Sequence, residues 1–229
     1  MTAEPVRIAI DDTHGVGGLL LAPKDAAACY VFAHGAGAGM SHAFMDAFAA
    51  DLAAVRIATL RYQFPYMERG SRRPDAPADA HAAVRAAVAH AHRSLPRLPL
   101  IAGGKSYGGR MTSQAQAITR LDGVRGLAFV GFPLHPAGKP AVDRAAHLRE
   151  VTIPMLFLSG TRDELADVAL LRGVVDSLAA RATLRLFDDA DHSLHVLARS
   201  GRKDADVRRL AAAAMAEWML TLSPAGPGP

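Results

Sequence analysis

The sequence predicts an α/β domain in which a doubly wound, mainly parallel sheet is flanked by helices. Three observations predict this fold. Short apolar segments alternate along the chain with longer segments of helical character. Some apolar segments, such as 29–33, have no polar side, as expected of parallel strands buried on both faces. Clusters of glycine and polar residues follow directly after these segments, and ligands bind at this edge of such a sheet.

The apolar segments define the predicted strands, and the segments between them define the predicted helices. The first two strands are separated by a turn-prone stretch and are expected to pair antiparallel. The first helix has aromatic and leucine residues spaced by four, and Ser41 is expected to cap it. The predicted strands are 6–10, 18–21, 29–33, 55–62, 98–103, 126–130, 154–159 and 183–187. The predicted helices are 41–54, 79–94, 107–120, 142–149, 166–180 and 204–222.

The length and composition fit one domain. Half of the 229 residues are hydrophobic and 21% are charged, which is typical of a globular chain. We expect a single domain over 1–222 and a structureless Pro/Gly tail over 223–229. The net charge is +4, but no basic run is interleaved with aromatic residues, so no nucleic-acid partner is expected.

Cellular location and redox state follow from absent patterns. The sequence has one cysteine, Cys29, in an apolar run, which predicts a buried inert thiol. The start of the chain has no signal-peptide pattern, and no apolar stretch approaches the ~20 residues that cross a bilayer. We therefore expect a cytoplasmic protein that does not enter a membrane.

The segment from Ile101 to Arg110 contains the pattern Gly104-Lys-Ser106-Tyr-Gly108 between a predicted strand and a predicted helix. This is the G-x-S-x-G pattern of a nucleophile elbow in the context that it requires. Glycines on both sides avoid a clash at the sharp turn, and the turn exposes the serine hydroxyl. The alternative is that Ser106 merely caps the following helix, but other motifs along the chain favour a nucleophile.

A serine nucleophile needs a histidine base, and the histidine needs a carboxylate that orients it. Ser106, Asp163 and His192 follow three different predicted strands in the order known for this kind of elbow. Glu164 and Asp167 compete with Asp163, and Asp167 is better explained by its position near a helix N-terminus. His195 competes with His192. The ten histidines are dispersed without a zinc-ligand spacing, so no metal is expected.

These motifs together resemble the α/β-hydrolase superfamily, more narrowly its small lidless branch similar to dienelactone hydrolase. The resemblance covers about residues 6–222 and includes Gly160-Thr-Arg-Asp163, Asp191-His192-Ser193 and His34-Gly-Ala36-Gly. It implies a Ser106–Asp163–His192 triad without a cofactor, and an oxyanion hole formed by the backbone N–H groups of Ala36 and Tyr107. Dienelactone hydrolase has cysteine as its nucleophile, so the serine puts its substrate, though not hydrolysis, in question.

Lys105 and Arg110 flank the serine although cations oppose the dipole at a helix N-terminus. We expect a buried ion pair that holds the elbow, and an anionic group of a substrate is the alternative partner. Further side chains are expected to rim the same edge of the sheet. These candidate pocket residues are His34, Arg61, Tyr62, Tyr66 and His135.

The sequence thus predicts hydrolysis of a small carboxylic ester or thioester through an acyl-serine. The predicted segment between strands 126–130 and 154–159 is too short for a large lid, so an open site for a small-molecule substrate is expected. Peptide cleavage or acyl transfer by the same triad, and a non-catalytic binding or scaffold role on the same fold, are the alternatives. The oligomeric state is left open.

Overall fold

The computed structural model describes residues 1–74 and 76–222, so the expected tail at 223–229 lies outside the described residues. One eight-stranded sheet has the order β1-β2-β4-β3-β5-β6-β7-β8. β1 and β2 pair antiparallel as predicted, β2 is antiparallel to β4, and the other neighbours are parallel. The strands are β1 (Glu4–Ala9), β2 (Gly15–Leu21), β3 (Ala28–Ala33), β4 (Ile57–Tyr62), β5 (Leu100–Lys105), β6 (Val124–Val130), β7 (Met155–Gly160) and β8 (Ala182–Phe187).

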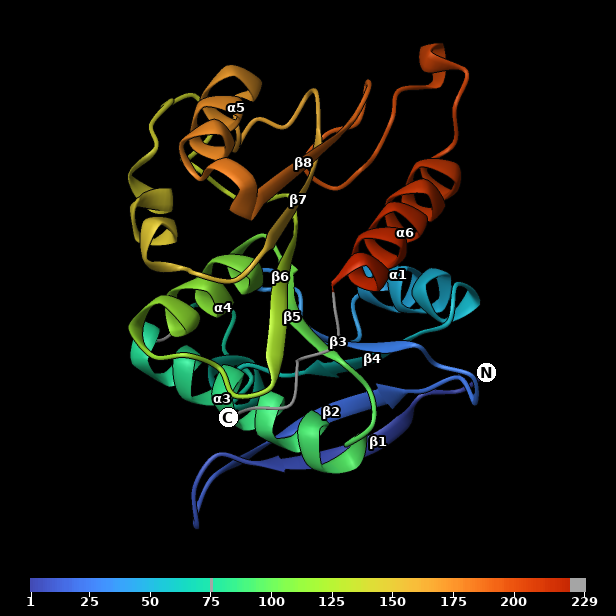
Figure 1. Cartoon of the computed structure of the whole chain (residues 1–229), viewed down its shortest axis with the longest axis vertical. Coiled ribbons are helices and arrows are strands. Elements are labelled where there is room, and N and C mark those ends of the chain that lie inside the picture. Colours follow the sequence, from blue (N-terminus) through green and yellow to red (C-terminus); the bar gives the residue numbers. More distant parts are fainter. Residues whose placement is uncertain (75, 223–229) are drawn as a thin grey trace.

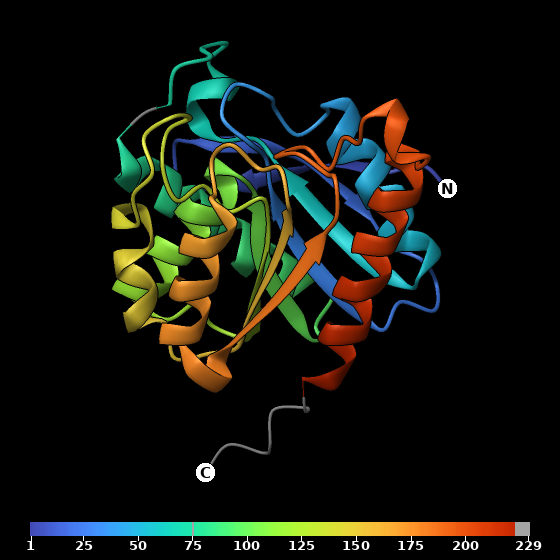
Figure 2. The same cartoon turned by 90° about the horizontal axis from the view of Figure 1, so that it is seen from above.

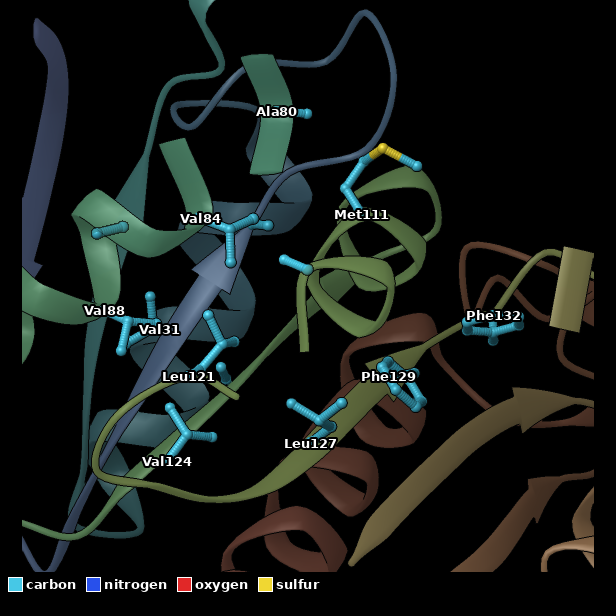
Figure 3. Close-up of a cluster of buried hydrophobic side chains, with 14 of the residues drawn as sticks. Val31, Ala80, Val84, Val88, Met111, Leu121, Val124, Leu127, Phe129 and Phe132 are labelled. Atoms are coloured by element: carbon cyan, nitrogen blue, oxygen red, sulfur yellow. The ribbon is translucent and has the colours of Figure 1, made fainter. Parts of the chain in front are cut away.

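The continuous apolar strands bury both of their faces. Successive side chains of a strand point to opposite sides, so Val31 of β3 belongs to one hydrophobic cluster and Tyr30 and Phe32 to the other. In the first cluster, Val31 and Phe129 lie on the sheet beneath Val84 and Met111 of the helices above (Figure 3). Two cores, one on each face, explain why these strands lack a polar side.

The helices form a layer on each face of the sheet. Figure 1 shows α1 and α6 on one face and α3, α4 and α5 on the other. Seen from above, the same two layers enclose the sheet (Figure 2). The 3₁₀ segment η1 packs on the side of α4 that faces away from the sheet. The helices are α1 (Ala43–Ala54), α2 (Pro65–Glu68), α3 (Pro77–Ser94), α4 (Tyr107–Ile118), α5 (Val168–Ser177) and α6 (Asp204–Thr221), and the 3₁₀ segments are η1 (Asp143–Glu150), η2 (Ala179–Arg181) and η3 (Ala198–Ser200).

The structure corrects several expected helix boundaries. The N-cap of α1 is His42 rather than Ser41, and its Nδ1 atom accepts a hydrogen bond of 3.2 Å from the Phe44 N–H. α2 lies where a loop was expected, with Pro65 in its first turn. The helix expected over 142–149 is the 3₁₀ segment η1. Over the described ranges 1–74 and 76–222, no helix is both long and apolar enough to span a bilayer.

The parallel strands bring the sequence motifs to one edge of the sheet. β5 lies between β3 and β6, and β7 and β8 follow β6 at the far side. Because carboxyl ends of parallel strands share an edge, the loops after β3, β5, β7 and β8 meet there. These loops carry Ala36, Ser106, Asp163 and His192, respectively.

Candidate active site

Ser106 connects β5 to α4 in a strained backbone conformation, with φ 51° and ψ −116°. The neighbouring glycines permit this turn, because a Cβ atom at Gly104 would lie 2.5 Å from the Ala33 carbonyl oxygen, and one at Gly108 would lie 2.6 Å from it. The Ser106 N–H donates to the Val130 carbonyl at 3.0 Å, which fixes the turn to β6. The Ser106 side chain makes no capping hydrogen bond to α4. A role as a helix cap therefore does not account for this serine.

Asp163 follows β7, and its carboxylate contacts His192. Both carboxylate oxygens lie 2.9 Å from Nδ1 of the imidazole, and Asp163 is 5% exposed. The Leu165 N–H also donates to Oδ1 at 2.9 Å, which orients the carboxylate. The competing Asp167 instead caps α5, where its Oδ1 accepts from the Leu170 N–H at 3.0 Å. Asp163, rather than Asp167, is thus the carboxylate beside the imidazole.

The loop after β8 holds His192 in a turn built around Asp191. Asp191 Oδ1 accepts from the N–H groups of Ser193 at 2.7 Å and His195 at 3.0 Å. The competing His195 points to the start of α6, where its Nδ1 lies 2.8 Å from Asp204. That carboxylate raises the pKa of His195, and the contact anchors the end of the loop. His195 accordingly has a structural partner away from Ser106.

His192 lines the same cavity as Ser106. Nε2 is buried and has no hydrogen-bond partner in the described part of the chain. Because Nδ1–H donates to the carboxylate, the neutral ring leaves Nε2 as a proton acceptor. The cavity has a volume of about 410 Å³. Its lining consists of Gly35, Ala36, Ala38, His42, Phe44, Met45, Lys105, Ser106, Leu165, His192 and Ser193.

The two backbone groups expected to form an oxyanion hole lie on either side of Ser106 in the fold. Ala36 is in the loop after β3 and lines the cavity. Its N–H donates no hydrogen bond to residues within 1–74 or 76–222. Tyr107 is the first residue of α4, at the helix end where partial positive charge accumulates. Both residues lie at the carboxyl edge of the parallel strands, as Ser106 does.

The cations at the elbow do not form the expected ion pair with any described residue. Lys105 is 9% exposed, and its Nζ donates to the main-chain carbonyl of His192 at 2.6 Å. Burial lowers the pKa of Lys105 to about 8, while the charges of Asp163 and Asp191 act in the opposite direction. The reason for the difference is geometric: at the end of β5, Lys105 points at a carbonyl of the adjacent loop rather than at a carboxylate.

Arg110 lies one turn into α4 and is partly buried, outside the cavity lining. Its Nε is buried without a hydrogen-bond partner among the described residues. Burial lowers the pKa of this guanidinium, the Arg144 charge lowers it further, and Tyr107 opposes the shift. Arg110 therefore lies close enough to Arg144 of η1 for the two charges to repel each other.

The remaining candidate pocket residues do not line the cavity. His34 donates from Nδ1 to the Gly35 carbonyl at 2.7 Å and accepts at Nε2 from the Phe64 N–H at 3.1 Å. Burial lowers its pKa to about 4, so the ring is neutral near pH 7. Tyr66 is also buried, and its hydroxyl accepts from the Gly37 N–H at 3.1 Å. Both side chains hold the loop that carries Ala36.

Arg61 and Tyr62 belong to β4 rather than to the loop at the rim, and both are buried. Arg61 donates to the Met40 carbonyl at 3.0 Å and forms an ion pair with Asp46. His135, after β6, accepts at Nε2 from the Asp167 N–H at 3.1 Å. These contacts connect β4 to α1 and the segment before it, and the loop after β6 to the start of α5.

Sequence reasoning missed several side chains of the cavity wall. His42, Phe44 and Met45 begin α1 directly after the loop that carries Ala36, and Leu165 lies two residues after Asp163. Their proximity in sequence to the motifs is the signal that could have identified them. The helical spacing of Phe44 indicated only a core position, because periodicity does not distinguish a core from a pocket wall.

A second serine–histidine pair lies elsewhere, between α4 and η1. Ser113 Oγ is 2.8 Å from His147 Nε2, but it also donates to the Arg110 carbonyl at 2.9 Å. Ser113 is buried within the helix, and no carboxylate of the described residues pairs with His147. This pair lacks the exposed turn that a nucleophile needs. Among the described residues, no group of three metal-ligating side chains is present either.

Comparisons with known proteins agree with the architecture. Residues 26–220 match the family model described as an alpha/beta hydrolase domain. The fold is similar to dienelactone hydrolase from Anabaena variabilis, at 18% identity and TM-score 0.78, over 97% of this chain and 99% of that one. It is also similar to an a/b serine hydrolase without lid from Xanthomonas campestris, at 19% identity and TM-score 0.71, over 99% and 98% of the two chains. An alpha-beta serine hydrolase homologue from Coxiella burnetii matches at 18% identity and TM-score 0.75, over 94% and 98%.

Proposed function

Because this chain belongs to the alpha/beta hydrolase domain family, we propose that it hydrolyses small carboxylic esters or thioesters through an acyl-serine intermediate. One observation carries the proposal: the Asp163-bound imidazole of His192 leaves its acceptor nitrogen buried and unpartnered among the described residues. That nitrogen belongs to a histidine that shares a cavity with Ser106. A base held by a carboxylate beside a strained serine is the arrangement that nucleophilic acyl transfer needs.

In the first half-reaction, Nε2 of His192 takes the hydroxyl proton as Ser106 Oγ attacks the acyl carbon. The tetrahedral intermediate collapses as the bond to the leaving group breaks, and the imidazolium returns its proton to the leaving alcohol or thiol. Asp163 keeps the imidazole in the required tautomer and stabilises its charged form. In the second half-reaction, His192 takes a proton from water as the water oxygen attacks the acyl carbon. The bond between the acyl carbon and Ser106 Oγ then breaks, His192 returns the proton to Oγ, and the carboxylic acid leaves.

The developing oxyanion would be stabilised by the backbone N–H groups of Ala36, in the loop after β3, and of Tyr107, the first residue of α4. Donors fixed in advance toward such a charge are typically worth about 10²–10³ in rate each. The partial positive charge at the start of α4 acts in the same direction.

The cavity favours small acyl groups. Its volume of about 410 Å³ falls at the lower end of the range for ligand pockets, roughly 300–1,000 Å³. Ala36, Ala38, Phe44, Met45 and Leu165 give it an apolar wall. The segment between β6 and β7 forms η1, which packs on α4 rather than over the cavity, so no lid from this segment restricts access.

The direct test is labelling with a fluorophosphonate, which reacts with activated serines. We expect stoichiometric modification at Ser106 and turnover of short p-nitrophenyl esters and their thioester analogues, compared over a chain-length series. Ser106→Ala should lose both labelling and turnover. Ser113→Ala is the matched control, because it removes a serine that also contacts a histidine. Labelling that persists in Ser106→Ala would contradict the proposal.

A further inference from the structure

The side chain of Lys105 has no role in the reaction described above, although it lines the cavity beside the nucleophile. It is the last residue of β5, and its Nζ donates at 2.6 Å to the main-chain carbonyl of His192. Ser106 and the residue before it thus both relate to His192: Ser106 lines the same cavity, and Lys105 hydrogen-bonds to the His192 main chain. No other described residue hydrogen-bonds to the main chain of His192.

The hydrogen bond from Lys105 reaches the middle of the β8–α6 loop, and other hydrogen bonds hold this loop on either side of His192. On the near side, Arg162 N–H donates to the Ala190 carbonyl at 2.8 Å. On the far side, Asp204 accepts from the Val196 N–H at 2.9 Å and contacts His195. Between these ties, Asp191 organises a turn internal to the loop, but it does not connect the loop to the strand of Ser106. Lys105 makes that connection.

We propose that Lys105 is a positioning residue, which holds the backbone of His192 so that its imidazole meets the Ser106 hydroxyl. This inference rests on the proposed function. Asp163 contacts Nδ1 of the imidazole, whereas Lys105 holds the main chain of His192 in place relative to β5. Proton transfer requires heavy atoms about 2.6–3.2 Å apart, so a small shift of this loop slows the reaction.

The environment of Lys105 supports a functional rather than a stabilising role. A buried ammonium group loses its hydration, which opposes folding, and its pKa of about 8 reflects that cost. The charges that offset it, Asp163 and Asp191, both belong to the loops that form the site. Nζ lies 5.9 Å from the centroid of the Phe44 ring. An apolar side chain would fill this position without the desolvation cost, but it could not hold the carbonyl.

The test compares Lys105→Met with the wild type on a neutral ester and on a matched ester that carries a carboxylate. We expect kcat to fall by roughly 10–100-fold on both esters while KM stays within about twofold, because a misplaced base slows chemistry without changing substrate binding. The rate of fluorophosphonate labelling at Ser106 should fall by a similar factor. Lys24→Met, which removes an exposed lysine between β2 and β3, is the matched control and should change neither value.

A second variant restores the ammonium group chemically. Lys105→Cys alkylated with 2-bromoethylamine carries an amine at nearly the original length, and mass spectrometry verifies the modification. Cys29, the one native cysteine, is buried, and burial raises its pKa to about 12, so it resists alkylation. We expect the alkylated protein to recover at least about tenfold in kcat over its unalkylated form.

Three results would overturn the proposal: wild-type kcat in Lys105→Met, a loss confined to KM on the anionic ester, or no recovery after alkylation. The second would make Lys105 a substrate contact instead. Failure of the proposed function is distinguishable from these results, because the wild type itself would then show no labelling at Ser106.

Discussion

The carboxylate of Asp163 lies with both oxygens 2.9 Å from Nδ1 of His192, in a position that is nearly closed to solvent. This contact fixes the proton on Nδ1 and leaves Nε2 as the acceptor. Asp163→Asn can present its amide group to Nδ1, which favours the opposite tautomer. We expect kcat for a short ester to fall by about 10⁴ with the fold retained, measured by initial rates and circular dichroism.

Asp167→Asn is the control for that variant. Asp167 is four residues away and caps α5 through a hydrogen bond that asparagine can also accept. Its kcat should remain within about twofold of the wild type. Equal losses in the two variants would show that the measurement reports general damage to this loop and would contradict the role of Asp163.

The two histidines of the β8–α6 loop should separate function from stability. His192→Ala is expected to lower kcat by about 10⁴–10⁶ because the base is removed. His195→Ala should leave kcat nearly unchanged, since this imidazole contacts Asp204 instead of the cavity. Initial rates on a short ester measure both. A larger loss in His195→Ala than in His192→Ala would reverse the assignment.

The His195–Asp204 pair also predicts a pH window of stability. Asp204 raises the pKa of His195 in the folded protein. The contribution of this imidazole to stability is therefore complete below pH 6.5, the pKa in the unfolded chain, and is lost as the pH rises through the pKa in the folded protein. The pKa of Asp204 is lowered, with the N–H of Val196 as the largest cause, so its contribution is lost as the pH falls below 3.8. The difference in Tm between wild type and His195→Ala should therefore be largest between about pH 4 and 6.5. In an Asp204→Asn background this pH dependence should vanish.

Much of the fold could be predicted because its parallel strands are buried on both faces. A run such as 29–33 must be apolar at every position, and this leaves an unambiguous pattern in the sequence. The boundaries were less predictable. The four-residue helix α2 is too short to leave a periodic pattern, and the first helix is capped by a histidine, a residue that no capping preference favours.

The sequence order of Ser106, Asp163 and His192 predicted which strand ends to examine, and their catalytic roles stay predictions. The order of these residues could not reveal which groups the neighbouring side chains contact. Arg61 has the charge expected of a rim residue but lies in a buried strand, where one of its terminal nitrogens contacts the Met40 carbonyl and Asp46. Lys105 was expected to pair with a carboxylate, yet its Nζ donates to the main-chain carbonyl of His192 in the β8–α6 loop. Contacts of this kind depend on how distant loops meet, which local patterns do not encode.

Gly131, directly after β6, packs against the imidazole of His192. Its φ is +63°, and a Cβ atom there would lie 2.9 Å from the His192 carbonyl oxygen and 3.1 Å from ring atoms Cε1 and Nδ1. Gly131→Ala should therefore displace the base as well as strain the backbone. We expect a fall in kcat of at least about tenfold and a loss of roughly 1–2 kcal/mol in unfolding free energy.

Gly70→Ala separates these two effects. Gly70 has a similar φ of +78°, but a Cβ atom there would meet nothing within 4 Å. Its unfolding free energy should also fall by roughly 1 kcal/mol, because the backbone strain is similar, while kcat stays unchanged. Urea unfolding and initial rates measure both. An unchanged kcat in Gly131→Ala would mean that the loop of His192 yields without consequence.

Lys105 should also affect stability in mildly alkaline solution. Burial lowers the pKa of Lys105 from 10.5 to about 8, with Asp163 and Asp191 opposing the shift, and His42 and His192 face the same cavity. Between these two values the unfolded chain binds a proton at Lys105 that the folded chain does not. Unfolding then takes up a proton, so this residue makes the free energy of unfolding rise as the pH increases from about 8 toward 10.5. Lys105→Met has no such group. We measure Tm from pH 7 to 10. Above about pH 8, the Tm of the wild type should rise relative to that of Lys105→Met, and Lys24→Met should show the same pH dependence as the wild type. Parallel curves for wild type and Lys105→Met would show that the ammonium group is not desolvated in the folded protein.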